Sequence, residues 1–248
     1  MALRRIRADL HIHTCLSPCG DLSVYPRRVV ELARAAGLDV IAVCDHNAAG
    51  NAAAVIESAR GTGLAVVPGM EIASEEEVHI LAWFPTLDDL LAVEADIAPE
   101  LPGLPARDAA RAEQVLVDKD DEVLGFSARN LLGATRRTVF ELVDLIHRKD
   151  GLAVASHIDR DAFSIISQLG FIPPELALDA LEVSPLTTIA RAREEIRPPA
   201  RFPLVRFSDA HRPEEIGRTA TDFLVAAPTL EEIALALKGE RGRRICRP

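Results

Sequence analysis

Short apolar runs rich in β-branched residues alternate with segments of helical periodicity along the chain, and this alternation limits the possible folds most strongly. It is typical of strand–helix units that build a parallel β-sheet in an α/β protein. Seven strands are predicted, with one further strand-like run near the C-terminus: residues 6–12, 40–44, 64–67, 78–84, 152–155, 180–183, 204–207 and 223–226. Seven or eight such units in 248 residues are what a (β/α) barrel requires.

Several segments between these runs carry helix start signals. Pro26 stands at the first position of an amphipathic stretch, where its fixed φ angle favours a helix start. Thr138 followed by Glu141 forms a capping box, and Thr229 with Glu232 repeats the pattern before the last apolar helical stretch. We therefore expect helices to begin at these three places.

One segment interrupts the alternation. Residues 87–136 contain Pro99, Pro102 and Pro105, followed by a charged, weakly periodic stretch without a convincing strand. Because this length is unusual for a loop, we expect a mostly helical insertion near one mouth of the barrel. The alternative is a surface insertion that takes no part in function. In both cases we expect a single barrel domain over residues 1–248.

The charge balance argues against polyanionic partners. The chain has 38 acidic and 28 basic residues and a formal net charge of −10, so we expect no strong nucleic-acid-binding surface and no membrane association. Its longest apolar stretches are strand-sized, and no signal-peptide core follows the basic N-terminus. Four cysteines are too few for a disulfide scaffold. These features predict a soluble cytoplasmic protein with reduced thiols.

Histidines gather at the ends of the predicted strands. Six of the seven lie there, namely His11, His13, His46, His79, His157 and His211. Only His79 lies near the start of a predicted strand, whereas Glu71 and Asp209 follow strands as most of the histidines do. Because catalytic groups of such barrels lie at the carboxyl ends of the strands, we expect these side chains to converge at one mouth.

The composition of this set indicates metal binding. Neutral imidazole nitrogens and carboxylate oxygens are ligands of zinc, manganese and iron, whereas the same groups buried without metal would lack polar partners. One His-x-His pair, here His11 and His13, is a modest signal, because alternate residues of any strand face the same way. The full set exceeds the needs of one tetrahedral ion, so we expect two or three divalent ions.

Six motifs, taken in order, resemble those of the PHP (polymerase and histidinol phosphatase) family. They are Asp9-Leu10-His11-Ile12-His13-Thr14, Cys44-Asp45-His46-Asn47, Gly69-Met70-Glu71-Ile72, Glu77-Val78-His79-Ile80, Ala155-Ser156-His157 and Ser208-Asp209-Ala210-His211. The resemblance extends from residue 5 to about residue 225. It implies a distorted (β/α)7 TIM-like barrel with a trinuclear metal site that hydrolyses phosphoesters.

The resemblance also implies how the ions are shared among the ligands. The first ion would be held by His11, His13, Glu71 and Asp209. The second would be held by His79, His157 and Glu71, which bridges the two ions. The third would be held by His46, His211 and one ligand from the first loop.

That last ligand is where this chain departs from many relatives, which carry an Asp or His shortly after the His-x-His-Thr motif. Here the loop reads Cys15-Leu16-Ser17-Pro18-Cys19-Gly20-Asp21. We predict Asp21 as the ligand, because a hard carboxylate suits manganese or iron. Cys19 is the alternative, since a thiolate would favour zinc. The identity of the metal depends on this choice.

Four residues near the motifs are expected to support the site. Asp9 and Asp45 precede predicted ligands, and we expect them to orient imidazole rings or to anchor a nearby arginine. Arg160 follows His157 closely and Arg212 is next to His211, so both are candidates for bidentate binding of a substrate phosphate.

Two further polar residues are expected to be structural. His147 lies in the last turn of a predicted helix, where an imidazolium interacts favourably with the helix dipole. Asn47 follows His46 directly and is expected to cap the next helix.

These observations predict a metal-dependent phosphoesterase. A metal-bound water held by Glu71, Asp209 and His211 would attack a small phosphomonoester or nucleotide. One alternative is exonuclease-like hydrolysis of short oligonucleotides, with or without a polymerase partner. Another is C–N hydrolysis of the amidohydrolase type, against which the Asp45-His46 and Glu71 motifs argue. The last alternative is a non-catalytic, metal-bound binding module.

Overall fold

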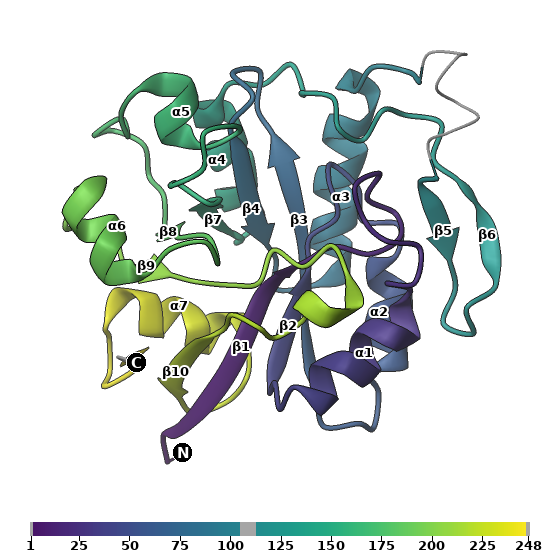
Figure 1. The fold of residues 1–248 in the computed structure, drawn as a ribbon, viewed down its shortest axis with the longest axis horizontal. Helices are drawn as coiled ribbons and strands as arrows, with labels where there is room; N and C mark the ends of the chain where they lie inside the picture. The colour runs from purple at the N-terminus through teal and green to yellow at the C-terminus, as the bar shows by residue number, and fades with distance from the viewer. Residues whose placement is uncertain (1, 105–112, 247–248) are drawn as a thin grey trace.

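A nine-stranded mixed sheet curls into a nearly closed barrel in the computed structural model, which describes residues 2–104 and 113–246 (Figure 1). The barrel strands are β1 (Arg4–Ile12), β2 (Val40–Val43), β3 (Ala65–Ala73), β4 (His79–Trp83), β7 (Leu152–Ala155), β8 (Ala180–Glu182), β9 (Leu204–Val205), β10 (Thr221–Val225) and β11 (Arg244–Ile245). The helices are α1 (Pro26–Ala35), α2 (Ala52–Ser58), α3 (Leu87–Ile97), α4 (Val139–His147), α5 (Ile165–Leu169), α6 (Ile189–Glu195) and α7 (Leu230–Lys238). The predicted α/β barrel is therefore confirmed.

The segment after β9 closes the sheet against its first long strand. The strands follow the order β11-β10-β1-β2-β3-β4-β7-β8-β9. Ala210 then forms a parallel bridge with Ile12, and its carbonyl accepts a hydrogen bond of 2.8 Å from the backbone N–H of His13. This closure brings residues near the two ends of the sequence side by side.

The sheet is not purely parallel, in contrast to the prediction. β4 is antiparallel to both β3 and β7, and β10 is antiparallel to β1. The reason lies in the length of β3, which continues to Ala73 and leaves only residues 74–78 before β4. Such a link makes a hairpin but is too short for a crossover between parallel strands.

β1 changes register just before the mouth of the barrel. Its pairing with β2 shifts between Asp9 and Ile12. Ile6 and Leu10 belong to one buried cluster with Trp83 and Phe207, whereas Ile12 packs in another cluster beside α1. The uninterrupted alternation expected for this strand is therefore broken by an irregularity, a device that re-aims side chains near active sites.

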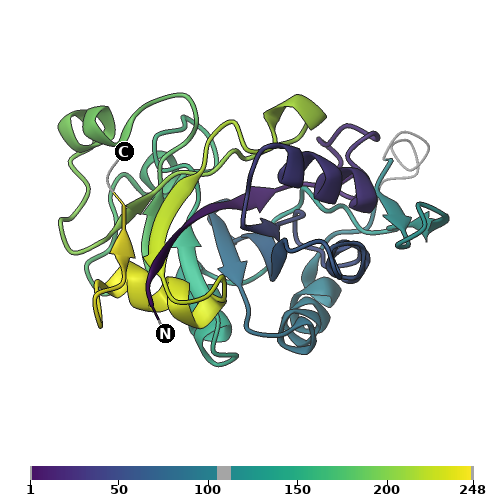
Figure 2. The same cartoon turned by 90° about the horizontal axis from the view of Figure 1, so that it is seen from below.

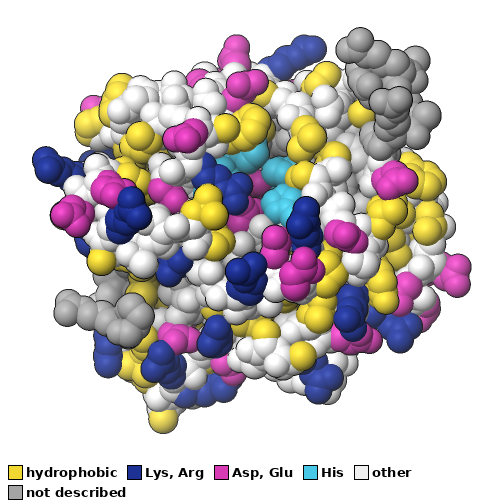
Figure 3. Space-filling view, viewed as in Figure 1, with side chains coloured by type: hydrophobic (Ala, Val, Ile, Leu, Met, Phe, Trp, Pro, Cys, Tyr) yellow, Lys and Arg dark blue, Asp and Glu magenta, His cyan; other side chains and the backbone are white. Residues whose placement is uncertain are grey.

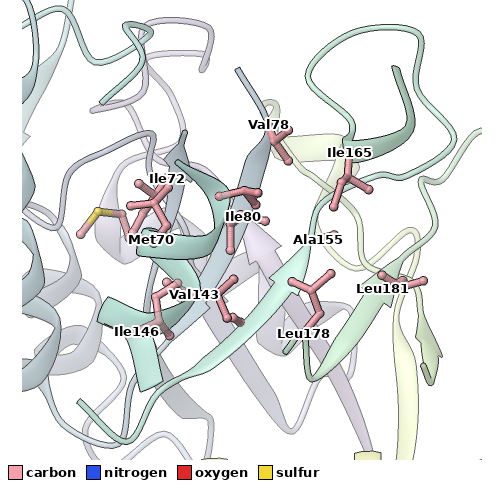
Figure 4. Close-up of a cluster of buried hydrophobic side chains, with 14 of the residues drawn as sticks. Met70, Ile72, Val78, Ile80, Val143, Ile146, Ala155, Ile165, Leu178 and Leu181 are labelled. Atoms are coloured by element: carbon pink, nitrogen blue, oxygen red, sulfur yellow. The ribbon is translucent and has the colours of Figure 1, made fainter. Parts of the chain in front are cut away.

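Apolar packing between the helices and the sheet fixes the outer layer. In α4, Val143 and Ile146 pack with Met70 and Ile80 of the strands beneath (Figure 4). The predicted capping box at the start of this helix is present, with the Thr138 side chain accepting from the Glu141 backbone and the Glu141 side chain accepting from Thr138. The cap predicted for α7 at Thr229 is present too.

The insertion contains a hairpin that was not expected. After α3 come a 3-10 turn, η1 (Ala98–Glu100), and the antiparallel strands β5 (Val115–Val117) and β6 (Val123–Phe126). Among the described residues of the insertion, the helical part is thus confined to the beginning. Residues 105–112, where the charged stretch starts, lie outside the described residues. The hairpin projects at the rim of the molecule (Figure 2). Val115 and Val117 pack against Cys15, which anchors the hairpin beside the loop after β1.

Within residues 2–104 and 113–246, no helix has both the length and the apolar character needed to cross a membrane.

Candidate metal centre

The side chains expected to converge do lie together at one mouth of the barrel, with Asp21 as the exception. They come from β1 (His11, His13), the loop after β2 (His46), β3 (Glu71), the start of β4 (His79), the loop after β7 (His157) and the segment after β9 (Asp209, His211). All are buried except His211, whose side chain is 22% exposed. Figure 3 shows histidine side chains at the bottom of a hollow on this face, with acidic and basic side chains beside them.

The antiparallel direction of β4 explains the position of His79. In a purely parallel barrel, the first residue of a strand would lie at the far end from the ligands. Because β4 runs the other way, His79 is at the same mouth, and its Nδ1 lies 3.2 Å from Oε1 of Glu71. The unexpected strand direction and the unusual position of this histidine are therefore one feature.

Glu71 lies at the centre of the cluster. Its two carboxylate oxygens are close to nitrogens of five histidines, at 3.5 Å (His11), 3.5 Å (His13), 3.0 Å (His46), 3.2 Å (His79) and 3.3 Å (His157). Asp209 is the second carboxylate of the cluster, and its Oδ1 lies 3.3 Å from Nε2 of both His11 and His13. A carboxylate with so many imidazole neighbours has the surroundings of a bridging metal ligand.

Several polar atoms of the cluster lack a hydrogen-bond partner. Among the described residues, the buried atoms Glu71 Oε1, His79 Nδ1 and His157 Nδ1 have none. Buried polar groups without partners are costly, and a cluster of them indicates a site for an ion. The donor set of imidazole and carboxylate fits zinc, manganese or iron.

Three groups of ligand atoms are compact enough to hold an ion. In each group the atoms lie within 4.8 Å of one another, and the groups are His11/His13/Glu71, His46/Glu71/His79 and His13/His46/His211. The first contains three of the four ligands expected for the first ion, without Asp209. The second contains His46 beside Glu71 and His79, and the third adds His13 to the expected pair of His46 and His211.

The electrostatics of the pocket keep its central carboxylate ionised. Burial raises the pKa of Glu71, but the surrounding histidines, His79 foremost, hold it well below its usual range. Burial lowers the pKa of His13 well below its usual value, and repulsion by His211 and His46 adds to the effect. An ionised carboxylate beside a neutral imidazole is the protonation state that a divalent metal requires.

In the first loop, the contacts of Asp21 and the electrostatics of Cys19 together favour Cys19 as the ligand. The Asp21 carboxylate turns to the protein surface, where Oδ1 accepts hydrogen bonds from the backbone and hydroxyl of Ser23 at 2.8 and 2.6 Å. Partial burial raises the pKa of the Cys19 thiol, but the neighbouring side chains of His211 and His46 outweigh this effect and lower the pKa to about 6. The expectation for Asp21 therefore fails on geometry, because a tight local turn engages its side chain.

Asp45 supports His13 through a hydroxyl group. Its Oδ1 accepts hydrogen bonds from the Ser17 hydroxyl and the Thr14 backbone, each at 2.7 Å. The Ser17 oxygen in turn lies 2.9 Å from Nδ1 of His13. A partner on the outer nitrogen sets the ring orientation and leaves Nε2 to face the centre.

Asp9 anchors the strand segment that carries Asp209. Its Oδ1 accepts from the backbone N–H of Ser208 at 3.0 Å, and its Oδ2 from that of Gly217 at 2.9 Å. Burial raises the pKa of Asp9 to about 6, although the hydrogen bond from Ser208 opposes the rise. Asp9 thus contacts backbone, not an imidazole ring or an arginine as expected.

Asn47 does not cap the next helix, contrary to the prediction. Its side-chain NH2 donates to the carbonyls of Leu131 and Gly133, each at 2.9 Å, and its Oδ1 accepts from the backbone of Ala73. Asn47 adopts a positive φ of 50°, so the chain turns there before α2 begins at Ala52. The residue ties the insertion to the mouth of the barrel.

Sequence reasoning missed one buried carboxylate of this region. Glu182 ends β8 and is completely buried, with both oxygens 3.0 Å from Nδ1 of His11. The sequence does contain the signal, because Glu182 lies near the end of the apolar run 180–183. Glu71 and Asp209 were identified by the same position at the end of a predicted strand.

A comparison with protein families then decides the relationship. The sequence profile of the PHP domain matches residues 9–168. The chain belongs to the PHP domain family. The resemblance drawn from the six motifs is therefore confirmed, and PHP proteins are metal-dependent hydrolases.

Known proteins that are similar to this PHP chain match it over different lengths. An uncharacterized protein of Methanocaldococcus jannaschii is 33% identical over 79 residues, or 29% of this chain and 46% of that protein. A lesion-specific endonuclease from Pyrococcus furiosus is 20% identical with a TM-score of 0.74, covering 98% of this chain and 58% of the endonuclease. A protein from Bifidobacterium adolescentis, described as a metal-dependent phosphoesterase, is 19% identical with a TM-score of 0.56, covering 82% and 87%. The chain thus spans about half the length of the first two proteins, and the structural matches establish the fold alone.

Proposed function

We propose that this PHP protein hydrolyses phosphoester bonds, using two or three divalent metal ions at the mouth of the barrel. The observation that carries the proposal is the central position of Glu71, whose oxygens lie within 3.5 Å of nitrogens from five histidines. One carboxylate with this environment would bridge two ions. A pair of ions so bridged is the usual arrangement of phosphoester hydrolases that use water as nucleophile.

The proposed ligands divide into three groups. His11, His13, Glu71 and Asp209 would hold one ion; His79, His157 and Glu71 would hold a second; His46, His211 and Cys19 would hold a third. Ions bound there would lower the pKa of a coordinated water and stabilise negative charge on the phosphate and the leaving oxygen. Of the histidine and carboxylate ligands, His211 is the most exposed, and together with the exposed Cys19 it would border the space from which substrate enters.

Arg160 is the proposed phosphate-binding residue. Its Nη2 forms an ion pair with Oδ2 of Asp209, and its buried Nε has no hydrogen-bond partner among the described residues. A guanidinium with an unused N–H beside a metal ligand suits bidentate binding of a phosphate. The other candidate, Arg212, is exposed, and its backbone N–H donates to Glu215. We therefore assign the role to Arg160 alone.

A groove beside Asp209 would receive the organic part of the substrate. Its volume is about 390 Å³, and Arg160, Leu186 and Arg218 line it together with Asp209. The Leu186 side chain is 81% exposed and offers an apolar surface, whereas Arg218 offers a second positive charge. An apolar wall with a few charged groups suits an organic phosphate such as a nucleotide.

A second candidate is hydrolysis of phosphodiesters in nucleic acid. It is favoured by the endonuclease from Pyrococcus furiosus, which matches 98% of this chain, and by a structure of endonuclease Q in complex with a duplex containing an abasic lesion. The two arginines of the groove beside Asp209 would serve a nucleic-acid strand as well as a nucleotide.

Phosphate release from an aryl phosphate monoester tests the first candidate. We expect release that a chelator abolishes and Mn²⁺ or Zn²⁺ restores, and that Asp209→Asn removes. An aryl phosphodiester and a short oligonucleotide, assayed in parallel, test the second candidate. Turnover of amides without any phosphoester turnover would contradict both and favour C–N hydrolysis. Metal binding without turnover of any of these substrates would favour a binding module.

A further inference from the structure

We infer that Glu182 is a positioning residue of the proposed metal centre, which sets the orientation of two histidines from two different strands. The carboxylate ends β8 and is completely buried. Both oxygens lie 3.0 Å from Nδ1 of His11, and Oε2 also accepts a hydrogen bond of 3.0 Å from the backbone N–H of His157. The inference rests on the proposed function only in so far as that function requires bound metal.

The contact with His11 decides which ring nitrogen carries the proton. An ionised carboxylate only accepts hydrogen bonds, so Nδ1 of His11 must donate. In the neutral ring that binds a metal ion, Nε2 then keeps its lone pair, and it faces Oδ1 of Asp209 at 3.3 Å and Oε1 of Glu71 at 3.5 Å. The nitrogen that points into the cluster is therefore free to bind a metal ion.

The contact with His157 holds a turn in an uncommon backbone conformation. His157 has a φ of 27°, which non-glycine residues rarely adopt. The Glu182 side chain accepts a hydrogen bond from the backbone N–H of His157. The Glu182 backbone carbonyl accepts one of 2.9 Å from the backbone N–H of Ile158. Glu182 thus holds two consecutive peptide groups, and this turn places Nε2 of His157 at 3.3 Å from Oε1 of Glu71.

The burial of Glu182 is hard to explain by folding alone. Among the described residues, its side chain has an ion pair only with His11, and no lysine or arginine contacts it. A buried carboxylate whose only charged partner is a histidine is costly to the fold, since that histidine must itself take up a buried proton. A metal ion bound on the far side of His11 would offset the cost of burying Glu182. Metal-binding histidines commonly have a carboxylate on the ring nitrogen that faces away from the ion.

The test is the affinity for Zn²⁺, measured by competition with a chromogenic chelator, in the wild type and three variants. We expect Glu182→Gln to weaken Zn²⁺ binding by about 10–100-fold, because the neutral amide removes the negative charge behind the Nδ1–H of His11 and keeps only one accepting oxygen. Glu182→Asp keeps the charge and should lose less. The matched control is Asp179→Asn at the other end of the same strand, where the Asp179 side chain is hydrogen-bonded to His147. This variant should bind Zn²⁺ with the affinity of the wild type.

Two results would overturn the inference. One is wild-type affinity in Glu182→Gln. The other is weaker binding by Glu182→Asp than by Glu182→Gln, since a role in packing alone would favour the variant that keeps the volume.

A second measurement needs no variant at all. In the Zn²⁺-loaded wild type, nitrogen NMR of the imidazole groups should find the proton of His11 on Nδ1, and a proton on Nε2 would refute the assignment. Both readouts are independent of turnover, so they hold their meaning even if no phosphoester proves to be a substrate.

Discussion

Two carboxylate–histidine pairs lie at opposite ends of strand β8, and they differ in burial and in surroundings. At the mouth, Glu182 contacts His11, and both side chains are completely buried. At the other end, Asp179 accepts from Nε2 of His147 at 3.0 Å and from the backbone of Ala153 at 2.9 Å. The His147 side chain is 34% exposed, lies at the end of α4 and belongs to none of the three groups of possible metal ligands.

The difference teaches how to tell a structural histidine from a ligand. Both carboxylates also accept a hydrogen bond from a backbone N–H, but the His147 ring is partly exposed, so this pair needs no further partner. At the mouth, buried nitrogens and oxygens of His79, His157 and Glu71 have no hydrogen-bond partner among the described residues. Convergence and unsatisfied burial, not the mere presence of a carboxylate–histidine pair, distinguish the proposed metal site.

The largest expected effect comes from exchanging a carboxylate at the mouth. Asp209→Asn should lower phosphoester turnover by about 10³-fold, because it removes a charged ligand close to both His11 and His13. The same exchange at the other end of β8, Asp179→Asn, should leave turnover within a few fold. Steady-state kinetics on both purified variants measure this contrast, and equal losses would abolish the distinction between the two ends.

A smaller effect is expected in the first loop. Cys19→Ser should weaken binding of one ion by about tenfold or more, since it removes the thiol beside His46 and His211. Asp21→Asn should leave the number of bound ions unchanged, because its carboxylate is held by the backbone and hydroxyl of Ser23 in the turn. Elemental analysis after dialysis against increasing concentrations of chelator measures how many ions each of the two variants retains. Loss of an ion in Asp21→Asn alone would restore the carboxylate as ligand.

A still smaller effect is expected at the groove beside Asp209. Arg218→Gln should raise KM for an organic phosphate with a second anionic group by a few fold, about 1 kcal/mol, because an exposed charge contributes little. The kcat should not change, and KM for a plain aryl phosphate should stay the same. Arg212→Gln is the control, since Arg212 does not line this groove. A fall in kcat for both substrates would place Arg218 nearer the chemistry than we propose.

The smallest effect concerns the histidine at the far end of β8. The hydrogen bond to Asp179 raises the pKa of His147 above its usual value, although partial burial opposes the rise. Its contribution to stability is therefore complete below pH of about 6.5, the value in the unfolded chain, and is lost as the pH rises through the raised pKa.

His147→Gln should accordingly lower the free energy of unfolding by up to about 1 kcal/mol at pH 5.5 and by less at pH 9. Urea unfolding at both values of pH measures the difference, while turnover stays unchanged. A larger loss at pH 9 than at pH 5.5 would reverse the sign of the argument and show that the imidazolium does not stabilise the fold.

Much of the site could be predicted from the sequence, because most of its ligands lie at the ends of apolar, strand-like runs. His11, His46 and His157 each come at the end of an apolar run, and a barrel carries such positions to a single mouth. The rule failed to explain His79, because the direction of β4 depends on how far β3 extends before the chain turns back. Glu182 obeys the rule but was overlooked, since a lone acidic residue in a strand carries no motif.

The chemistry of the ligands and their order along the chain are contained in the linear sequence, because residue type and strand-end position are local properties. Packing in three dimensions decided the rest. It turned Asp21 toward Ser23 and Cys19 toward His46 and His211, and it placed Glu182 behind His11. The reason is that a side chain's direction depends on turn geometry and on partners far away in sequence, which no local pattern encodes.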